Sequence, residues 1–321
     1  MGDANTTSQA DFTIPYSCYI VESLLMITCN VLAIKVIVSL GKMKTSFYNV
    51  VLFLLFVSHL LTALMLFIKA SLFLAYFHKD IIEGVVMARD CFISLEINFT
   101  ILLSFDRFVA VRKPFFYGKL TSRHGAAAIA VAIGLTIFFT AWRTVSTKAY
   151  MAAFFVVIIG AVLIIVSNFL LYRSVKRQCR QIAATIVDKS SQQQHDKRQE
   201  IRTRELRSLK VCLFIASSYI LTWVPLIIVQ TLHNFQKANE KDVISVEILI
   251  KFLAILTFTN GIWDVVIFFA LNLKARTKLL MLLHLSKPTH RRYSDMYATN
   301  AISPTAIVRR ETVIVKESLK L

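Results

Sequence analysis

Seven long apolar stretches constrain the fold of this chain more than any other feature. A helix that crosses a membrane needs about 20 mostly apolar residues. The segments of this kind are 16–40, 48–77, 82–109, 126–142, 150–172, 211–232 and 246–271. Hydrophobic residues make up 56% of the 321 residues and charged residues only 17%, which is too apolar for a soluble protein of this size. The sequence therefore predicts an all-α membrane protein, with a seven-transmembrane helix bundle over residues 16–271.

The basic residues predict how the bundle is oriented. If the N-terminus lies outside, most of the 37 lysines and arginines fall in the inner loops and in the C-terminal tail. This is the arrangement that the positive-inside rule favours. Contact with anionic lipid of the inner leaflet explains the net charge of +18. We therefore expect membrane lipid, and not nucleic acid, as a partner.

Three segments flank the predicted bundle. Residues 1–15 form the predicted extracellular N-terminus, whose first dozen residues are polar and expected to be disordered. Asn5 begins a glycosylation sequon there. Residues 273–285 combine an apolar face with basic residues at one end, which predicts an interfacial helix. Residues 286–321 are polar and form the predicted cytoplasmic tail. The five cysteines have no paired spacing, so no metal site is predicted from them.

Polar side chains interrupt the apolar spans. Asn30 lies in the first span, His59 in the second and Glu96 in the third. A buried Asn must find a hydrogen-bond partner, so we interpret Asn30 as a tie between helices. Ionisable groups are costly in hydrocarbon, and His59 and Glu96 therefore indicate a functional core.

A second polar group lies in the outer halves of the spans, where an extracellular ligand would bind. Its members are Lys69, Arg89, Asp90 and Gln230, and the aromatic Trp142 is a further candidate ligand contact. Lys69 and Arg89 favour a ligand with an anionic group, such as a lipid acid or a peptide carboxylate. In the alternative interpretation, Arg89 pairs with Asp90 or Glu96, and Lys69 reaches the membrane interface.

The inner end of the third span carries the adjacent charges Asp106 and Arg107, just before the turn that contains Pro114 and Phe115. Charges at a membrane edge are costly without a use, so we expect a signal to cross here. In the sixth span, Pro225 removes a backbone hydrogen bond and predicts a kink that can act as a pivot.

Three motifs together resemble the rhodopsin-like, or class A, family of G-protein-coupled receptors. They are Asp106-Arg107-Phe108, Trp223-Val224-Pro225 and Asn260-Gly261-Ile262-Trp263-Asp264, in the third, sixth and seventh spans. The likeness covers almost the whole chain. It implies a receptor of the plasma membrane, and not an enzyme, that transmits the binding of an extracellular ligand to heterotrimeric G proteins.

The resemblance also implies roles for single residues. Arg107 would contact the G protein, with Glu205 as its acidic partner in the resting state. The implied G-protein coupling residues are Asp106, Arg107, Pro114, Phe115 and Glu205. The implied activation switch consists of Tyr219, Trp223, Pro225, Asn260, Asp264 and Phe268.

The chain departs from the family pattern in its core. The family usually has Asp where this chain has His59, and Asn-Pro-x-x-Tyr where this chain has Asp264 to Phe268. Aligned with the family, His59, Glu96, Asn260 and Asp264 surround the site where many relatives hold sodium. One interpretation is a structural hydrogen-bond network. In the other, His59 pairs with Asp264 or Glu96, so that the core responds to protons or retains a shifted sodium site; no other cofactor is expected.

Missing residues suggest a branch of the family. The fourth span lacks the usual Trp, the fifth lacks the usual Pro, and Ile82 stands where a Cys is usual at the outer start of the third. These absences resemble the melanocortin, cannabinoid and lysophospholipid branch.

Other classes of seven-helix protein remain as alternatives. A retinal protein would need a lysine where Phe258 stands in the seventh span. A small membrane transporter would favour an internal repeat or paired broken helices, and the sequence shows neither. A seven-helix protein that does not couple to G proteins is the further alternative.

Overall fold

The computed structural model describes the chain in segments. These are residues 4–41, 47–75, 78–112, 117, 122–145, 159–160, 162–167, 169–170, 172–173, 192–238 and 244–285. Within these segments the secondary structure is helical and no strand occurs. The chain divides into two compact units, Met1–Arg276 and Thr277–Leu321. The functional residues described below lie in the first unit.

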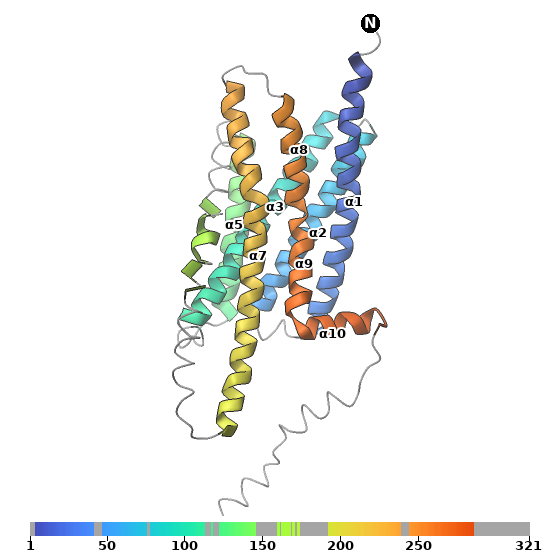
Figure 1. The fold of residues 1–321 in the computed structure, drawn as a ribbon. Helices are drawn as coiled ribbons and strands as arrows, with labels where there is room; N and C mark the ends of the chain where they lie inside the picture. The colour runs from blue at the N-terminus through green and yellow to red at the C-terminus, as the bar shows by residue number, and fades with distance from the viewer. Residues whose placement is uncertain are drawn as a thin grey trace, which may run out of the picture. The chain divides into compact units, whose positions relative to one another are not determined.

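Eight helices make up most of the described chain (Figure 1). They are α1 (Ala4–Ser39), α2 (Phe47–Leu74), α3 (Lys79–Arg112), α5 (Ser122–Val145), α7 (Gln192–Ala238), α8 (Ile244–Phe258), α9 (Asn260–Leu271) and α10 (Leu273–Leu282). The predicted fifth span, 150–172, is described only in part, as short helical pieces between 159 and 173. The predicted interfacial helix is present as α10, whose Ala275 N–H donates to the side-chain oxygen of Asn272.

Five described helical segments are long and apolar enough to cross a membrane. They are Pro15–Ser39, Phe47–Leu74, Arg123–Trp142, Lys210–His233 and Leu249–Leu271. The third helix, α3, is not among them because charged side chains are spread along it, Arg89, Asp90 and Glu96 included. Its length of 34 residues is nevertheless sufficient to span a bilayer.

Two helices extend well beyond the predicted spans. Helix α1 begins at Ala4, so the expectation of a disordered segment over the first dozen residues was wrong from residue 4 onward. The helix continues upstream of Pro15 although this residue has no backbone N–H to donate. Helix α7 begins at Gln192 and has 47 residues, which corresponds to a length of about 70 Å. It is therefore far longer than the hydrocarbon layer.

The seventh predicted span is divided in two by Thr259. Helix α8 ends at Phe258 and α9 begins at Asn260. The Thr259 hydroxyl donates to the carbonyl of Leu256 at 2.6 Å. The interruption places the amide of Asn260 and the flexible backbone of Gly261 in the interior, where both are buried.

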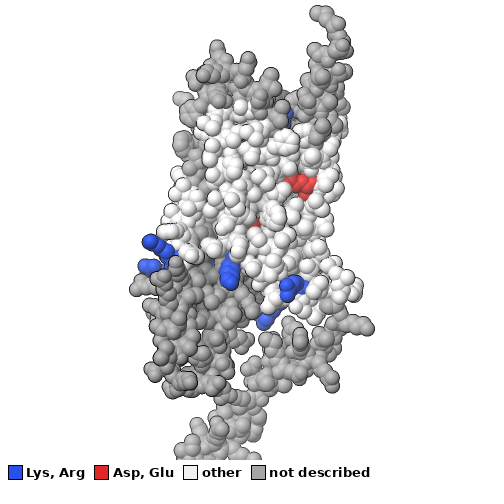
Figure 2. Space-filling view, viewed as in Figure 1, with Lys and Arg blue, Asp and Glu red and all other residues white. Residues whose placement is uncertain are grey.

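The helices of the first unit pack around α2, which contacts both α1 and α3. Helix α7 contacts α3, α8 and α9. Gly261 allows α9 to approach its neighbours, because a Cβ at this position would collide with Met26 of α1 and lie 3.3 Å from Cγ of His59. On the face seen in Figure 2, most of the visible Lys and Arg side chains lie below a wide band of mostly uncharged side chains, in which an acidic patch is also visible. A mostly uncharged band of this kind suits contact with lipid.

Candidate functional site

The centre of the bundle holds a charged cluster of His59, Glu96 and Asp264. Nε2 of His59 lies 3.1 Å from Oδ2 of Asp264, and Nδ1 lies 3.2 Å from Oε1 of Glu96. The first contact is a hydrogen bond. The second is a close charge contact whose angle does not meet hydrogen-bond geometry. His59 thus faces both of the carboxylates considered from the sequence, and not only one of them.

Hydroxyl groups complete the charged cluster. Thr62 donates to Glu96, and Ser218 donates to Oδ1 of Asp264 at 2.9 Å. The charged cluster and its hydroxyl donors together bring side chains from α2, α3, α7 and α9 into contact. Since α7 carries Pro225 seven residues after Ser218, the cluster is attached to the helix that the sequence predicts to pivot.

The predicted core amides lie beside the cluster. Asn30 donates to the carbonyl of Gly261 at 3.4 Å, which links α1 to α9. Asn260 is buried, and its Oδ1 has no hydrogen-bond partner among the described residues. Phe268 is also buried and packs edge-on against Phe56, with ring centroids 5.5 Å apart.

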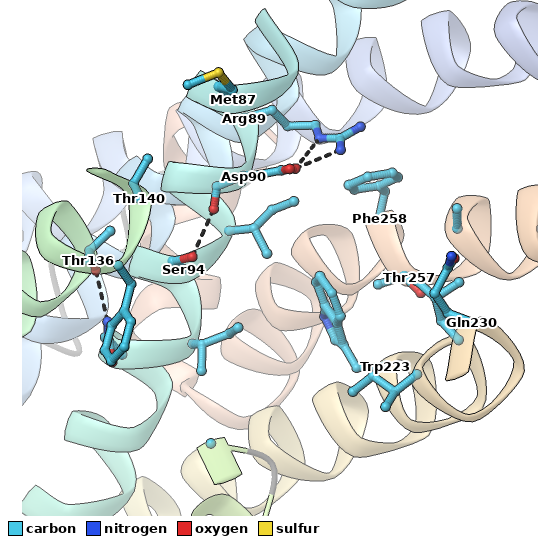
Figure 3. Close-up of a pocket in the computed structure, with 18 of the residues that line it drawn as sticks. Met87, Arg89, Asp90, Ser94, Thr136, Thr140, Trp223, Gln230, Thr257 and Phe258 are labelled. Atoms are coloured by element: carbon cyan, nitrogen blue, oxygen red, sulfur yellow. Dashed lines mark hydrogen bonds and ion pairs between the residues drawn. The ribbon is translucent and has the colours of Figure 1, made fainter. Parts of the chain in front are cut away.

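A cavity of about 660 Å³ lies between the helices on the outer side of this cluster. Lys69, Arg89, Asp90 and Gln230 line it, together with Trp223 of the predicted switch. The expectation for Trp142 was wrong, because its side chain is exposed and is not among the residues that line the cavity. Figure 3 shows Arg89 and Asp90 of α3 pointing toward Phe258 of α8. Trp223 stacks on Tyr219, with ring centroids 5.5 Å apart. The cavity wall is therefore connected by direct contact to the residue next to Ser218.

The charged wall of the cavity contains two cations and one anion. Nε and Nη2 of Arg89 donate to Oδ1 of Asp90 at 3.0 and 2.7 Å. The guanidinium also lies over the ring of Phe258, and Nζ of Lys69 lies 5.8 Å from the ring centroid of Tyr16. The pairing of Arg89 with Asp90, which was one of the two interpretations of the sequence, is thus present. It leaves an excess of one positive charge on the wall.

Other cavity residues were not singled out from the sequence. Tyr19 of α1, Asn98 of α3 and Thr136 of α5 all line the cavity. Nδ2 of Asn98 donates to the Thr136 hydroxyl at 2.8 Å, as Figure 3 shows. The sequence did indicate that Asn98 needs a partner, because it is a polar side chain in an apolar helix. It did not indicate that the partner would be Thr136.

At the inner end of α3, Arg107 is enclosed by an acidic and two aromatic side chains. Its Nε donates to Oδ2 of Asp106 at 2.8 Å, and its Nη2 donates to the hydroxyl of Tyr117 at 3.1 Å. Tyr117 in turn donates to Oδ1 of Asp106 at 2.9 Å. The ring of Tyr48 lies under the guanidinium, 4.5 Å away. Nothing in the sequence distinguished Tyr48 or Tyr117 from other tyrosines near the membrane edge.

The hydroxyl of Tyr117 remains protonated in this arrangement. Burial raises the pKa of Tyr117 to about 12, and the Asp106 carboxylate adds to the rise. The hydroxyl can therefore accept from Arg107 and donate to Asp106 at the same time. We call Asp106, Arg107 and Tyr117 the inner triad.

Several predicted residues lie outside what the structure describes. Pro114 and Phe115 are in the undescribed segment 113–116. Glu205 and Asn5 belong to helices α7 and α1, but their side chains are not described. The pairing of Arg107 with Glu205 and the glycosylation of Asn5 therefore stay predictions.

The family model for the 7 transmembrane receptor (rhodopsin family) matches residues 29–267. The matched range includes the charged cluster, the inner triad and the residues that line the cavity, except Tyr19. No curated protein matches the chain at a significant level.

Proposed function

Because the chain belongs to the rhodopsin family of seven-transmembrane receptors, we propose that it carries an extracellular signal across the plasma membrane to heterotrimeric G proteins. Membership in this family makes the chain a multi-pass membrane receptor. It also favours a receptor over the transporter and over the other seven-helix proteins considered above. The ligand class, the coupling to G proteins and the absence of catalysis are our proposals.

The observation that carries the proposal is the direct packing of the cavity onto the core. Trp223 lines the cavity and stacks on Tyr219, and the adjacent Ser218 donates to Asp264. A ligand that contacts Trp223 therefore acts on α7, the helix whose Ser218 bonds to Asp264 of the charged cluster. It shifts the equilibrium only if it binds one position of α7 better than the other.

Helix α7 has the features of a pivot at this level. Pro225 lies inside the helix and cannot donate a backbone hydrogen bond. In the turn before it, the carbonyl of Thr222 accepts a hydrogen bond from Thr257 of α8 at 3.1 Å. We propose that α7 swings about this point while Tyr219 and Trp223 change their packing.

The cavity favours an apolar ligand with one anionic group. Aliphatic and aromatic side chains form most of its wall, and Lys69 and Arg89 outnumber Asp90. A carboxylate or phosphate on the ligand would compensate the excess positive charge and could take a guanidinium hydrogen bond. A lipid acid and a peptide with a free carboxylate both meet these requirements. The proximity to the melanocortin, cannabinoid and lysophospholipid branch stays a prediction.

The inner triad is the proposed output. In the resting state Asp106 and Tyr117 hold the guanidinium of Arg107, and we propose Glu205 as an additional partner. Opening of the inner face would release Arg107 to contact the G protein, with Pro114 and Phe115 in the docking turn. The inner triad thus has to break before the receptor signals.

The ligand proposal is tested by screening in cells that carry G-protein reporters. Lipid acids, peptides and amines are applied to the wild type and to the Lys69→Ala and Arg89→Ala variants. We expect activation by an anionic compound, with a potency that falls in both variants. The matched control is the methyl ester or amide of the active compound, which should have lower potency on the wild type and lose little more in the variants. Activation by amines alone would refute the anionic ligand.

A further inference from the structure

We propose that the side chain of His59 is a built-in cation between Glu96 and Asp264, at the place where family resemblance implies a sodium ion. The receptor core would then not depend on sodium. This inference rests on the charged cluster alone and requires neither the ligand nor the G protein proposed above.

The two ring nitrogens of His59 carry the first part of the argument. Nε2 faces Asp264 at 3.1 Å and Nδ1 faces Glu96 at 3.2 Å. A neutral imidazole has an N–H on only one nitrogen, so its other nitrogen would hold a lone pair within 3.2 Å of a carboxylate oxygen, although the Nδ1 contact is a charge contact and not a hydrogen bond. The imidazolium ion has an N–H on both. The arrangement therefore fits the positively charged ring.

The hydroxyl donors carry the second part. Asp264 accepts from Ser218 as well as from His59, and Glu96 accepts from Thr62. Both oxygens of Asp264 thus act as acceptors, which is the behaviour of an ionised carboxylate, and Oε1 of Glu96 accepts as well. Two buried carboxylates without a cation would be strongly destabilising. Among the charged side chains that the structure describes, His59 is the group placed between them.

The packing around the His59 ring leaves no room for a sodium ion in the charged cluster. His59 is 1% exposed. One side of the ring faces Gly261, where even a Cβ would lie 3.3 Å from Cγ of His59 and collide with Met26. His59 and the hydroxyls of Ser218 and Thr62 already contact both oxygens of Asp264 and Oε1 of Glu96, which a hard cation would need. The residues present therefore do not fit sodium.

Removing the histidine should create the missing ion site. His59→Asp replaces the built-in cation with a third carboxylate, and a sodium ion can then neutralise the cluster. His59→Asn keeps a side chain of similar reach but removes the positive charge, and it serves as a second variant. His233 is a matched control, because it is also buried, lies in α7, and has an Nδ1 without a hydrogen-bond partner in the described chain.

The test is the melting temperature of the purified, detergent-solubilised receptor in sodium chloride and in potassium chloride at equal ionic strength. We expect no difference between the salts for the wild type or for His233→Asp. For His59→Asp and His59→Asn we expect sodium to raise the melting temperature by about 2–4 °C in a saturable manner, because a ligand that binds only the folded state stabilises it.

Two results would overturn the proposal. One is a saturable, sodium-specific stabilisation of the wild type, which decides the matter even if neither variant folds. The other is a folded His59 variant whose melting temperature does not distinguish sodium from potassium. Because the readout is heat stability, the proposed function fails or succeeds separately, in the reporter assay.

Discussion

The two ends of α3 carry the same pair of neighbours, an arginine beside an aspartate, in different surroundings. At the outer end Arg89 bonds to Asp90, and their side chains are 15% and 19% exposed on the cavity wall. At the inner end Arg107 bonds to Asp106, whose side chain is only 2% exposed. Tyr117 closes the inner pair into a ring of hydrogen bonds.

This difference suggests how one helix can serve two roles. The outer pair can exchange partners with a ligand group, because the pair is open to the cavity. The inner pair has to lose Tyr117 before Arg107 can reach another protein. Glu96 lies between the two pairs on α3 and is the residue that α3 contributes to the charged cluster. The predictions below test the connection first and then each end.

The largest effect is expected from breaking the connection between the outer and inner pairs, which runs through the charged cluster. Asp264→Ala removes the hydrogen-bond partner of His59 and Ser218 and leaves Glu96 as the one remaining carboxylate beside His59. Breaking a buried ion pair in this way costs about 3–5 kcal/mol. We expect little folded receptor at the cell surface and a melting temperature lower by about 10 °C. Asp264→Asn removes the charge but keeps the volume and one acceptor, so a much smaller loss than that of Asp264→Ala would argue against a charge effect.

The second prediction distinguishes the two ends of α3, because a variant at the inner end should lose signalling and a variant at the outer end should lose potency. Arg107→Ala should remove most of the ligand-stimulated signal and leave ligand binding nearly unchanged. Arg89→Ala should reduce potency by roughly tenfold or more, since a hydrogen bond to a charged group contributes about 1.5–3 kcal/mol, and leave the maximal signal intact. Dose–response curves and binding isotherms at equal surface expression measure both. The same defect in both variants would mean that the ends are not distinct.

A third prediction concerns the acidic partner inferred for Arg107. Glu205→Ala should raise the signal without ligand severalfold in a reporter assay, because the resting state loses a contact that the active state lacks. Glu205→Gln retains a hydrogen-bond acceptor and should raise it less. A baseline that stays at the wild-type level in both variants would remove Glu205 from the resting state.

The sequence predicted the positions of the helices better than the contacts between their side chains. Apolar runs indicated where helices lie, and the polar residues within those runs included His59 and Glu96 of the charged cluster. Whether His59 would face Asp264 or Glu96 could not be predicted, because it depends on how far apart three helices stand. The break at Thr259 was missed for a related reason: threonine is common within membrane helices, and only packing at Gly261 makes the interruption useful.

The inner triad shows the same limit. Arg107 stood out because a charge at a membrane edge is unusual. Tyr117 did not, since a tyrosine there usually marks only the membrane interface. Its contact with Arg107 depends on the path of the loop between α3 and α5, which no local pattern in the sequence encodes.

The smallest of these effects is also the most direct test of the central claim that the inner triad holds the receptor at rest. Tyr117→Phe removes one hydroxyl and leaves the ring in place. Losing about 1 kcal/mol from the resting state should raise the signal without ligand roughly fivefold. The measurement is basal G-protein signalling at equal surface expression, with Arg107→Ala/Tyr117→Phe as the control in which the rise should vanish. A Tyr117→Phe receptor with the wild-type basal signal would contradict the account.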